Sequence, residues 1–137
     1  MNNKTIKKSY PPIPMEVEQI GKAVLDAAYK VHTTFGPGLL ETVYETALAF
    51  ELRKGGFKVD SQMNVPIVYE GEILASGLRL DLIVENCVIV ELKAVEEIKP
   101  LYEAQLMTYL RLCQVRLGYL MNFNVEHLKD GIKRIVC

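Results

Sequence analysis

The segment from residue 78 to residue 93 constrains the fold more than any other part of the chain. It contains two apolar runs, LRLDLIV and VIVELK, which are separated by the three residues 85–87. Both runs have the composition of β-strands, and the short gap between them predicts an antiparallel hairpin. Because side chains alternate along a strand, Leu78, Leu80, Leu82 and Val84 should share one face, and Arg79, Asp81 and Ile83 the other.

The register of this hairpin follows from keeping its apolar face free of charge. Residues directly opposite each other in an antiparallel pair point to the same face. A two-residue connection would place Asp81 opposite Val90 and Glu91 opposite Leu80, which mixes carboxylates with the apolar face. A three-residue connection places Asp81 opposite Glu91 and leaves the other face wholly apolar. We therefore predict the three-residue connection, with two carboxylates side by side.

This arrangement needs a source of positive charge. Two adjacent carboxylates on a mostly buried hairpin repel each other and are costly to desolvate. Their oxygens suit Mg²⁺ or Mn²⁺, and Lys93, on the same face as Glu91, could then orient an attacking water or stabilise a phosphodiester transition state. A plain salt-bridge network with Arg79 and Lys93 is the alternative, and the hairpin alone leaves both open.

The first third of the chain has helical periodicity. Apolar residues recur at spacings of three and four over residues 16–35, with an inward stripe of Val17, Ile20, Val24, Ala28, Val31 and Phe35. Gly36-Pro37-Gly38 ends this helix as a rigid turn. A second helix should start near Leu39 and stop before Gly55, with Leu40, Val43, Ala47 and Phe50 pointing inward.

The remaining segments predict a mixed sheet. We expect a strand over residues 65–69 that ends in a Glu70-Gly71 turn and is followed by another strand, then the hairpin, a helix over residues 100–112, and strands over residues 117–123 and 132–136. This order indicates a single α/β domain with helices packed on the sheet. Its bounds should be residues 15–137, after a solvated tail over residues 1–14.

Composition and charge exclude several classes of protein. The 137 residues carry 16 Lys and Arg against 17 Asp and Glu, so bulk positive charge cannot hold nucleic acid. Three cysteines without metal-ligand spacing fit a reduced, cytoplasmic protein, and neither a membrane span nor a signal peptide is expected. Five basic residues could form a phosphate-binding rim or merely a solvated face: Lys99, Arg111, Arg116, Lys133 and Arg134.

At Asp81 and Glu91-Leu92-Lys93, the sequence resembles the PD-(D/E)XK nuclease superfamily, although Leu80 stands where the superfamily name has Pro. Gly38-Leu39-Leu40-Glu41-Thr42-Val43-Tyr44 resembles the signature of its small prokaryotic GxxExxY branch. The similarity extends from the first helix to Val136.

The resemblance implies a restriction-endonuclease-like fold and a role for each matched residue. Glu41, Asp81 and Glu91 would bind the metal, Lys93 would be the catalytic lysine, and Gln105 and Tyr109 match a Gln-x-x-x-Tyr motif of the RecB-like exonuclease branch that positions substrate. Positions i and i+4 share a helix face, so both side chains can reach one groove.

The implied function is a Mg²⁺- or Mn²⁺-dependent phosphodiesterase that acts on nucleic acid, with DNA favoured over RNA. A nuclease-fold module that binds nucleic acid or protein without catalysis is the alternative. A small acidic domain could also use a homodimer or a protein partner to hold its substrate. Two further side chains have open roles: Tyr44 lines the cleft or packs on the sheet, and His32 caps the first helix rather than taking part in catalysis.

Overall fold

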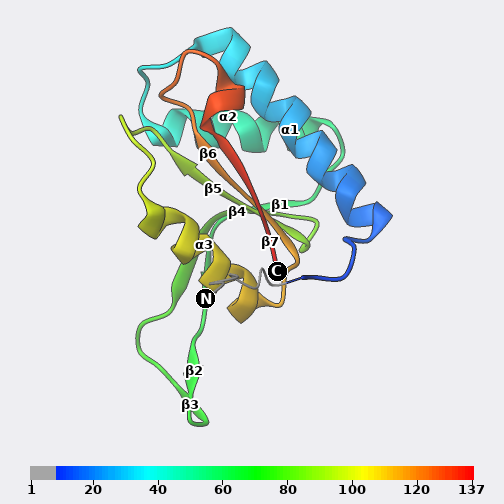
Figure 1. The fold of residues 1–137 in the computed structure, drawn as a ribbon, viewed down its shortest axis with the longest axis vertical. Helices are drawn as coiled ribbons and strands as arrows, with labels where there is room; N and C mark the ends of the chain where they lie inside the picture. Colours follow the sequence, from blue (N-terminus) through cyan, green and yellow to red (C-terminus); the bar gives the residue numbers. More distant parts are fainter. Residues whose placement is uncertain (1–8) are drawn as a thin grey trace, which may run out of the picture.

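The computed structural model describes residues 9–137, so the first eight residues of the predicted tail lie outside the described part. The elements follow in the order α1 (Met15–Phe35), α2 (Glu41–Lys54), β1 (Val59–Val65), β2 (Val68–Tyr69), β3 (Glu72–Ile73), β4 (Leu78–Val84), β5 (Val88–Lys93), α3 (Pro100–Cys113), β6 (Leu117–Asn122), the 3-10 turn η1 (Leu128–Gly131) and β7 (Ile132–Val136) (Figure 1).

A mixed sheet of five strands, in the order β1-β4-β5-β6-β7, forms the centre of the molecule. Strands β5 and β6 are parallel, with α3 as the crossover between them, and the other neighbours are antiparallel. Helices α1 and α2 lie together on one face of the sheet, and α3 covers the other (Figure 1). This architecture confirms the predicted α/β class and the restriction-endonuclease-like arrangement of a sheet flanked by helices.

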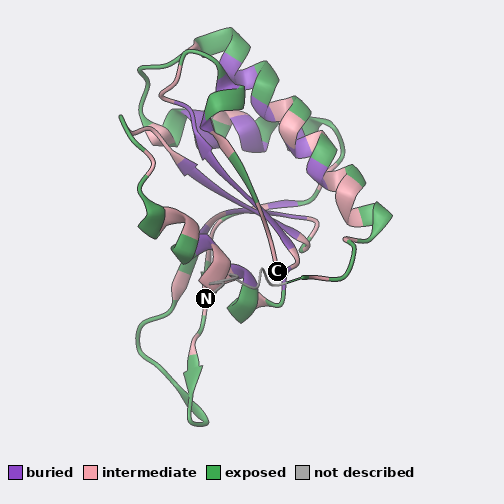
Figure 2. Ribbon diagram, in the orientation of Figure 1, coloured by how far each residue is buried: buried purple, intermediate pink, exposed green. Residues whose placement is uncertain are grey.

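Two apolar clusters fill the space between these layers. The larger lies between the sheet and the helices α1 and α2, and the smaller lies between the sheet and α3. The central strands β5 and β6 are buried along almost their whole length (Figure 2), as expected for strands covered on both faces. The prediction of the β4 faces is right for Leu82 and Val84 but wrong for Leu80, which packs in the α3 cluster together with Ile83.

Helix α2 presents a different face to the core from the one predicted. Its buried residues are Tyr44, Glu45, Leu48, Ala49 and Leu52. The expected inward residues Leu40 and Phe50 are 74% and 62% exposed, and Phe35 at the end of α1 is 46% exposed. The helix carries apolar residues on two stripes, so periodicity alone could not choose between them. The outer stripe instead lines a surface groove between α1 and α2 that includes Val43 and Phe50.

The strand predicted over residues 65–69 is also wrong in its bounds. Strand β1 begins six residues earlier and ends at Val65. Strands β2 and β3 form a separate two-stranded arm that projects from the body of the molecule (Figure 1). The predicted Glu70-Gly71 turn is confirmed at the tip of this arm, where both residues have positive φ.

No helix within residues 9–137 is long and apolar enough to cross a membrane. The described end of the predicted tail does contact the body: the carbonyl oxygen of Pro11 accepts a hydrogen bond from Arg116.

Candidate active site

The hairpin of β4 and β5 brings the two predicted carboxylates together. Leu82 pairs with Val90 and Val84 with Val88, which confirms the three-residue connection and places Asp81 opposite Glu91. Regular backbone pairing of the two strands ends at Leu82. Beyond it, hydrogen bonds between side chains and backbone join the strands. Glu91 Oε1 accepts the Asp81 N–H at 3.2 Å, and Asp81 Oδ2 accepts the Leu92 N–H at 2.9 Å. The carboxylates therefore lie where the strands begin to separate.

Glu91 is the most strongly perturbed carboxyl group of this site. It is only 7% exposed, and this burial, reinforced by the neighbouring Asp81 carboxylate, raises its pKa to about 8. The Lys93 ammonium opposes the shift but does not cancel it. At neutral pH the Glu91 carboxyl therefore keeps its proton unless another positive charge enters the site.

Glu41 approaches the same region from the first turn of α2. Burial raises its pKa, the Asp81 and Glu45 carboxylates raise it further, and the Lys93 ammonium lowers it. These mutual effects mean that Glu41, Asp81 and Lys93 lie within electrostatic range of one another. The helix N-terminus is also a favourable place for a carboxylate.

Tyr44 fixes the turn that delivers Glu41, and it does not line the cleft. The side chain is fully buried and stacks on Phe123, with ring centroids 4.7 Å apart. Its hydroxyl donates a hydrogen bond to the Gly36 carbonyl at 2.6 Å and accepts one from the Leu39 N–H at 3.1 Å. His32 is similarly structural: it is 6% exposed, and its Nε2 lies 2.7 Å from the carbonyl oxygen of Val125.

Lys93 is held beside an aromatic ring of α3. Its Nζ lies 4.5 Å from the centre of the Tyr102 ring, a distance at which a cation is attracted to the ring face. Lys93 also lowers the pKa values of Glu41 and Glu91, so its ammonium lies within electrostatic range of both carboxyl groups. Tyr102 was not predicted as a site residue, although it lies one turn before Gln105 on the predicted helix.

Helix α3 contributes Tyr109 to the same neighbourhood. Burial raises the pKa of the Tyr109 hydroxyl, and the charges of Glu91 and Asp81 raise it further. Gln105 lies one turn earlier on this helix and is exposed to solvent. Tyr109 thus lies within electrostatic range of the carboxylates, while the structure gives Gln105 no contact with them.

Besides Tyr102, two more residues of the site were not predicted from the sequence. Glu45 is only 8% exposed, and Gln62 on β1 donates from its Nε2 to Glu45 Oε1 at 2.7 Å and to Asp81 Oδ1 at 3.3 Å. Burial raises the pKa of Glu45, Asp81 raises it further, and the hydrogen bond from Gln62 lowers it. The spacing of Glu45 from Glu41 was a usable signal, because i and i+4 share a helix face. Gln62 gave no such signal, since β1 was not predicted there.

Glu41, Asp81 and Glu91 have the ligand chemistry of a divalent cation site, although their side chains are not close enough together to form one. Carboxylate oxygens are the ligands that Mg²⁺ and Mn²⁺ prefer. Burial and the neighbouring Asp81 carboxylate raise the pKa values of Glu41 and Glu91, and the Lys93 ammonium offsets this only in part. Within residues 9–137, no three His, Cys, Asp or Glu side chains are close enough together to hold a metal ion. Binding of a cation would therefore require these side chains to move closer together.

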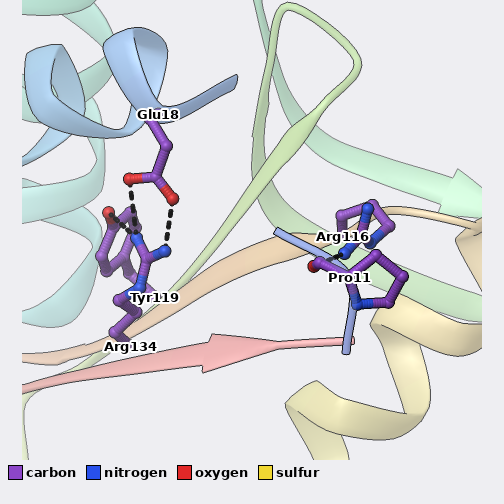
Figure 3. Close-up of polar contacts among 5 residues, drawn as sticks. All are labelled: Pro11, Glu18, Arg116, Tyr119 and Arg134. Atoms are coloured by element: carbon purple, nitrogen blue, oxygen red, sulfur yellow. Dashed lines mark hydrogen bonds and ion pairs between the residues drawn. The ribbon is translucent and has the colours of Figure 1, made fainter. Parts of the chain in front are cut away.

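The predicted basic rim does not form as a set. Figure 3 shows that Arg134 is bound to Glu18 and to the Tyr119 hydroxyl, and that Arg116 is bound to the Pro11 carbonyl. Lys133 pairs with Glu103 at 2.8 Å. Arg111 donates a hydrogen bond to Thr108 Oγ1 at 3.3 Å. Four of the five basic residues thus have protein partners, which favours the interpretation of these four as structural.

Comparison with known proteins identifies a family for this chain. The family model described as the PD-(D/E)XK nuclease superfamily matches residues 18–135, a span that contains every carboxylate described above. Comparisons with curated proteins and with solved structures gave no significant match. The family match supports a nuclease-type function, and nucleases of this family generally use divalent metals.

Proposed function

The chain belongs to the PD-(D/E)XK nuclease superfamily, and we propose that it is a Mg²⁺- or Mn²⁺-dependent phosphodiesterase that cleaves nucleic acid, with DNA favoured over RNA. The observation that carries the proposal is the pair of the half-buried Asp81 and the buried Glu91, since burial of Glu91 and the nearby Asp81 carboxylate raise the pKa of Glu91 to about 8. A cation is the natural complement of such a pair. The segment 38–44 further supports membership of the GxxExxY branch.

In this proposal, Glu41, Asp81 and Glu91 hold the metal. When bound, the metal supplies a Lewis acid that makes water more acidic and neutralises charge on the phosphate. The Lys93 ammonium, steadied by the Tyr102 ring, orients the attacking water and stabilises the negative charge that develops on the phosphoryl oxygens. Tyr109 and Gln105 position the substrate backbone along α3. The preference for DNA rests on the Gln-x-x-x-Tyr resemblance.

The net charge of −1 bears on how substrate is held. A domain without excess positive charge should bind nucleic acid weakly unless metal, a homodimer or a protein partner supplies attraction. We place the protein in the cytoplasm on the basis of its sparse cysteines. A catalytically silent binding module remains the alternative function, and the intact set of Glu41, Asp81, Glu91 and Lys93 favours the enzyme over it.

A cleavage assay separates the two functions. Purified protein is incubated with single- and double-stranded DNA and RNA in Mg²⁺, Mn²⁺ or EDTA, beside Asp81→Asn. The matched control is Asp60→Asn, a carboxylate on the neighbouring strand whose side chain is 42% exposed. We expect metal-dependent cleavage that Asp81→Asn abolishes and Asp60→Asn preserves. Equal cleavage by both variants would indicate a contaminant, and absence of cleavage by the wild type on every substrate would favour the silent module.

A further inference from the structure

We propose that Gln62 is a positioning residue of this site, which fixes the Asp81 carboxylate for metal binding and ties it to Glu45 on α2. This inference rests on the proposed function, because it assigns Gln62 a role toward the same cation. Gln62 makes no contact with the reacting atoms in this scheme. It acts through Asp81, and the arrangement of its hydrogen bonds carries the argument.

The amide nitrogen of Gln62 bridges two carboxylates. It donates one hydrogen to Glu45 Oε1 at 2.7 Å and the other to Asp81 Oδ1 at 3.3 Å. An amide nitrogen has two hydrogens, so both are used. The reverse orientation of the amide would put its oxygen against two carboxylates, which electrostatic repulsion disfavours. Gln62 is thus the donor that lets Glu45 and Asp81 lie near each other.

Asp81 is consequently held from both neighbouring strands. Gln62 on β1 binds its Oδ1, and the Leu92 N–H on β5 binds its Oδ2 at 2.9 Å. Two donors on different oxygens fix the plane of the carboxylate, whereas one would leave it free to rotate. Groups that orient metal ligands in this way tune metal affinity even though they do not touch the metal.

The backbone of Gln62 supports the same conclusion. Regular pairing of β1 with β4 includes Ser61 with Leu82 and Met63 with Leu80, but not Gln62 with Asp81 between them. Gln62 has a φ of 50°, in the left-handed region that residues other than Gly, Asn and Asp seldom adopt. Such strain persists only where surrounding contacts hold it, and it often marks functional sites. Here it accompanies the two hydrogen bonds directly opposite a proposed metal ligand.

Two variants test whether Gln62 positions Asp81 or only joins α2 to β1 through its hydrogen bond with Glu45. Gln62→Leu removes both hydrogen bonds at similar side-chain size. The double variant Gln62→Glu with Glu45→Gln restores a donor and an acceptor between positions 45 and 62, but it gives Asp81 a carboxylate neighbour instead of an amide donor. Ser61→Ala, on the adjacent exposed position, is the control.

The readout is the Mn²⁺ dissociation constant from calorimetry, with thermal unfolding in EDTA measured in parallel. We expect about ten- to hundredfold weaker binding for Gln62→Leu. The double variant should regain thermal stability without regaining affinity, and Ser61→Ala should match the wild type. Should Gln62→Leu fail to fold, the double variant alone gives the test.

Two results would overturn the role of Gln62: wild-type affinity in Gln62→Leu, or full recovery of affinity in the double variant. The latter would mean that only the tie between α2 and β1 matters. Failure of the wild type itself to bind Mn²⁺ would instead contradict the proposed function, so the two failures are distinguishable.

Discussion

Glu91 shows how burial and a neighbouring charge set the chemistry of a single residue. In water, a glutamate carboxyl has a pKa near 4.5, but here it is about 8, because burial and the Asp81 carboxylate both oppose ionisation. Its charge state therefore changes near neutral pH rather than in acid. A residue of this kind makes the stability of the fold depend on pH in the range where the protein is easily studied.

We expect the metal-free protein to lose stability as pH rises from about 5 to about 8. The folded state holds the Glu91 proton up to its raised pKa of about 8, whereas the unfolded chain releases it near 4.5. The folded state thus binds more protons in between, and raising the pH favours unfolding by on the order of a few kcal/mol at most. Urea unfolding in EDTA at several pH values measures this loss.

The matched comparison is Glu91→Gln, which removes the titrating group, against Glu96→Gln in the exposed segment after β5. The free energy of unfolding of Glu91→Gln should depend less on pH than that of the wild type. Some dependence should be left, because burial also raises the pKa values of Glu41 and Glu45. Profiles of equal slope for wild type and Glu91→Gln would show that Glu91 is not perturbed.

Lys93 offers a separation of binding from catalysis. Replacing it by methionine removes a positive charge beside Glu41 and Glu91. We expect Lys93→Met to bind Mn²⁺ at least as tightly as the wild type, because cation–cation repulsion is relieved. Cleavage should fall by about a hundredfold or more if the ammonium acts in the transition state.

Lys58→Met, on an exposed lysine near the start of β1, should leave both cleavage and Mn²⁺ affinity unchanged. Weakened metal binding in Lys93→Met, or normal cleavage, would contradict the role proposed for Lys93.

For single residues, the sequence predicted those neighbours that follow from the alternation of side chains along a strand. Asp81 and Glu91 could be paired because only one register leaves an apolar face, and that register is observed. Gln62 could not be found, because its position depends on a left-handed backbone conformation that strand periodicity does not encode.

Among the elements, α2 determines how much of the site is assembled. Its buried face delivers Glu41 and Glu45 toward β4, and the opposite face would have turned Glu45 to solvent. The helix has two apolar stripes, so the hydrophobic pattern was compatible with either face. Tyr44 distinguishes the two faces of the helix. Its hydroxyl can be buried because it forms hydrogen bonds with two backbone groups in the turn before the helix.

Tyr44→Phe should therefore destabilise the fold by about 1–3 kcal/mol, since the Gly36 carbonyl and the Leu39 N–H both lose a partner. Urea unfolding measures the change. The control is Tyr69→Phe in the projecting arm, where the side chain is 64% exposed and the effect should stay within about 0.5 kcal/mol. Equal stability of the two variants would show that the turn before α2 does not depend on Tyr44.

The strands differ in how well their bounds could be predicted. Strands β4, β5 and β6 are mostly buried and mostly apolar, and their bounds lie within a residue of those expected. Strand β1 is an edge strand with the sequence VDSQMNV, whose polar residues hid its start. The arm of β2 and β3 follows β1. Its apolar and polar residues alternate as in a strand of a central sheet, although β2 and β3 pair only with each other.

For the whole molecule, charge and fold together limit where nucleic acid can be attracted. The net charge is −1, and four of the five basic residues considered for substrate binding are bound to protein groups. The Asp81 carboxylate on the hairpin adds negative charge where a phosphate would have to approach. A divalent cation reverses the sign of the field at that point, so the account depends on its binding there.

The most direct test is therefore calorimetric titration of the protein with Mn²⁺ at pH 7, in two buffers of different ionisation enthalpy. We predict saturable binding with release of about one proton per site, because Glu91 must ionise to become a ligand. Asp81→Asn should weaken or abolish binding, and Glu91→Gln should bind weakly without proton release. Absence of saturable binding by the wild type, or unchanged binding by Asp81→Asn, would contradict a metal site on this hairpin.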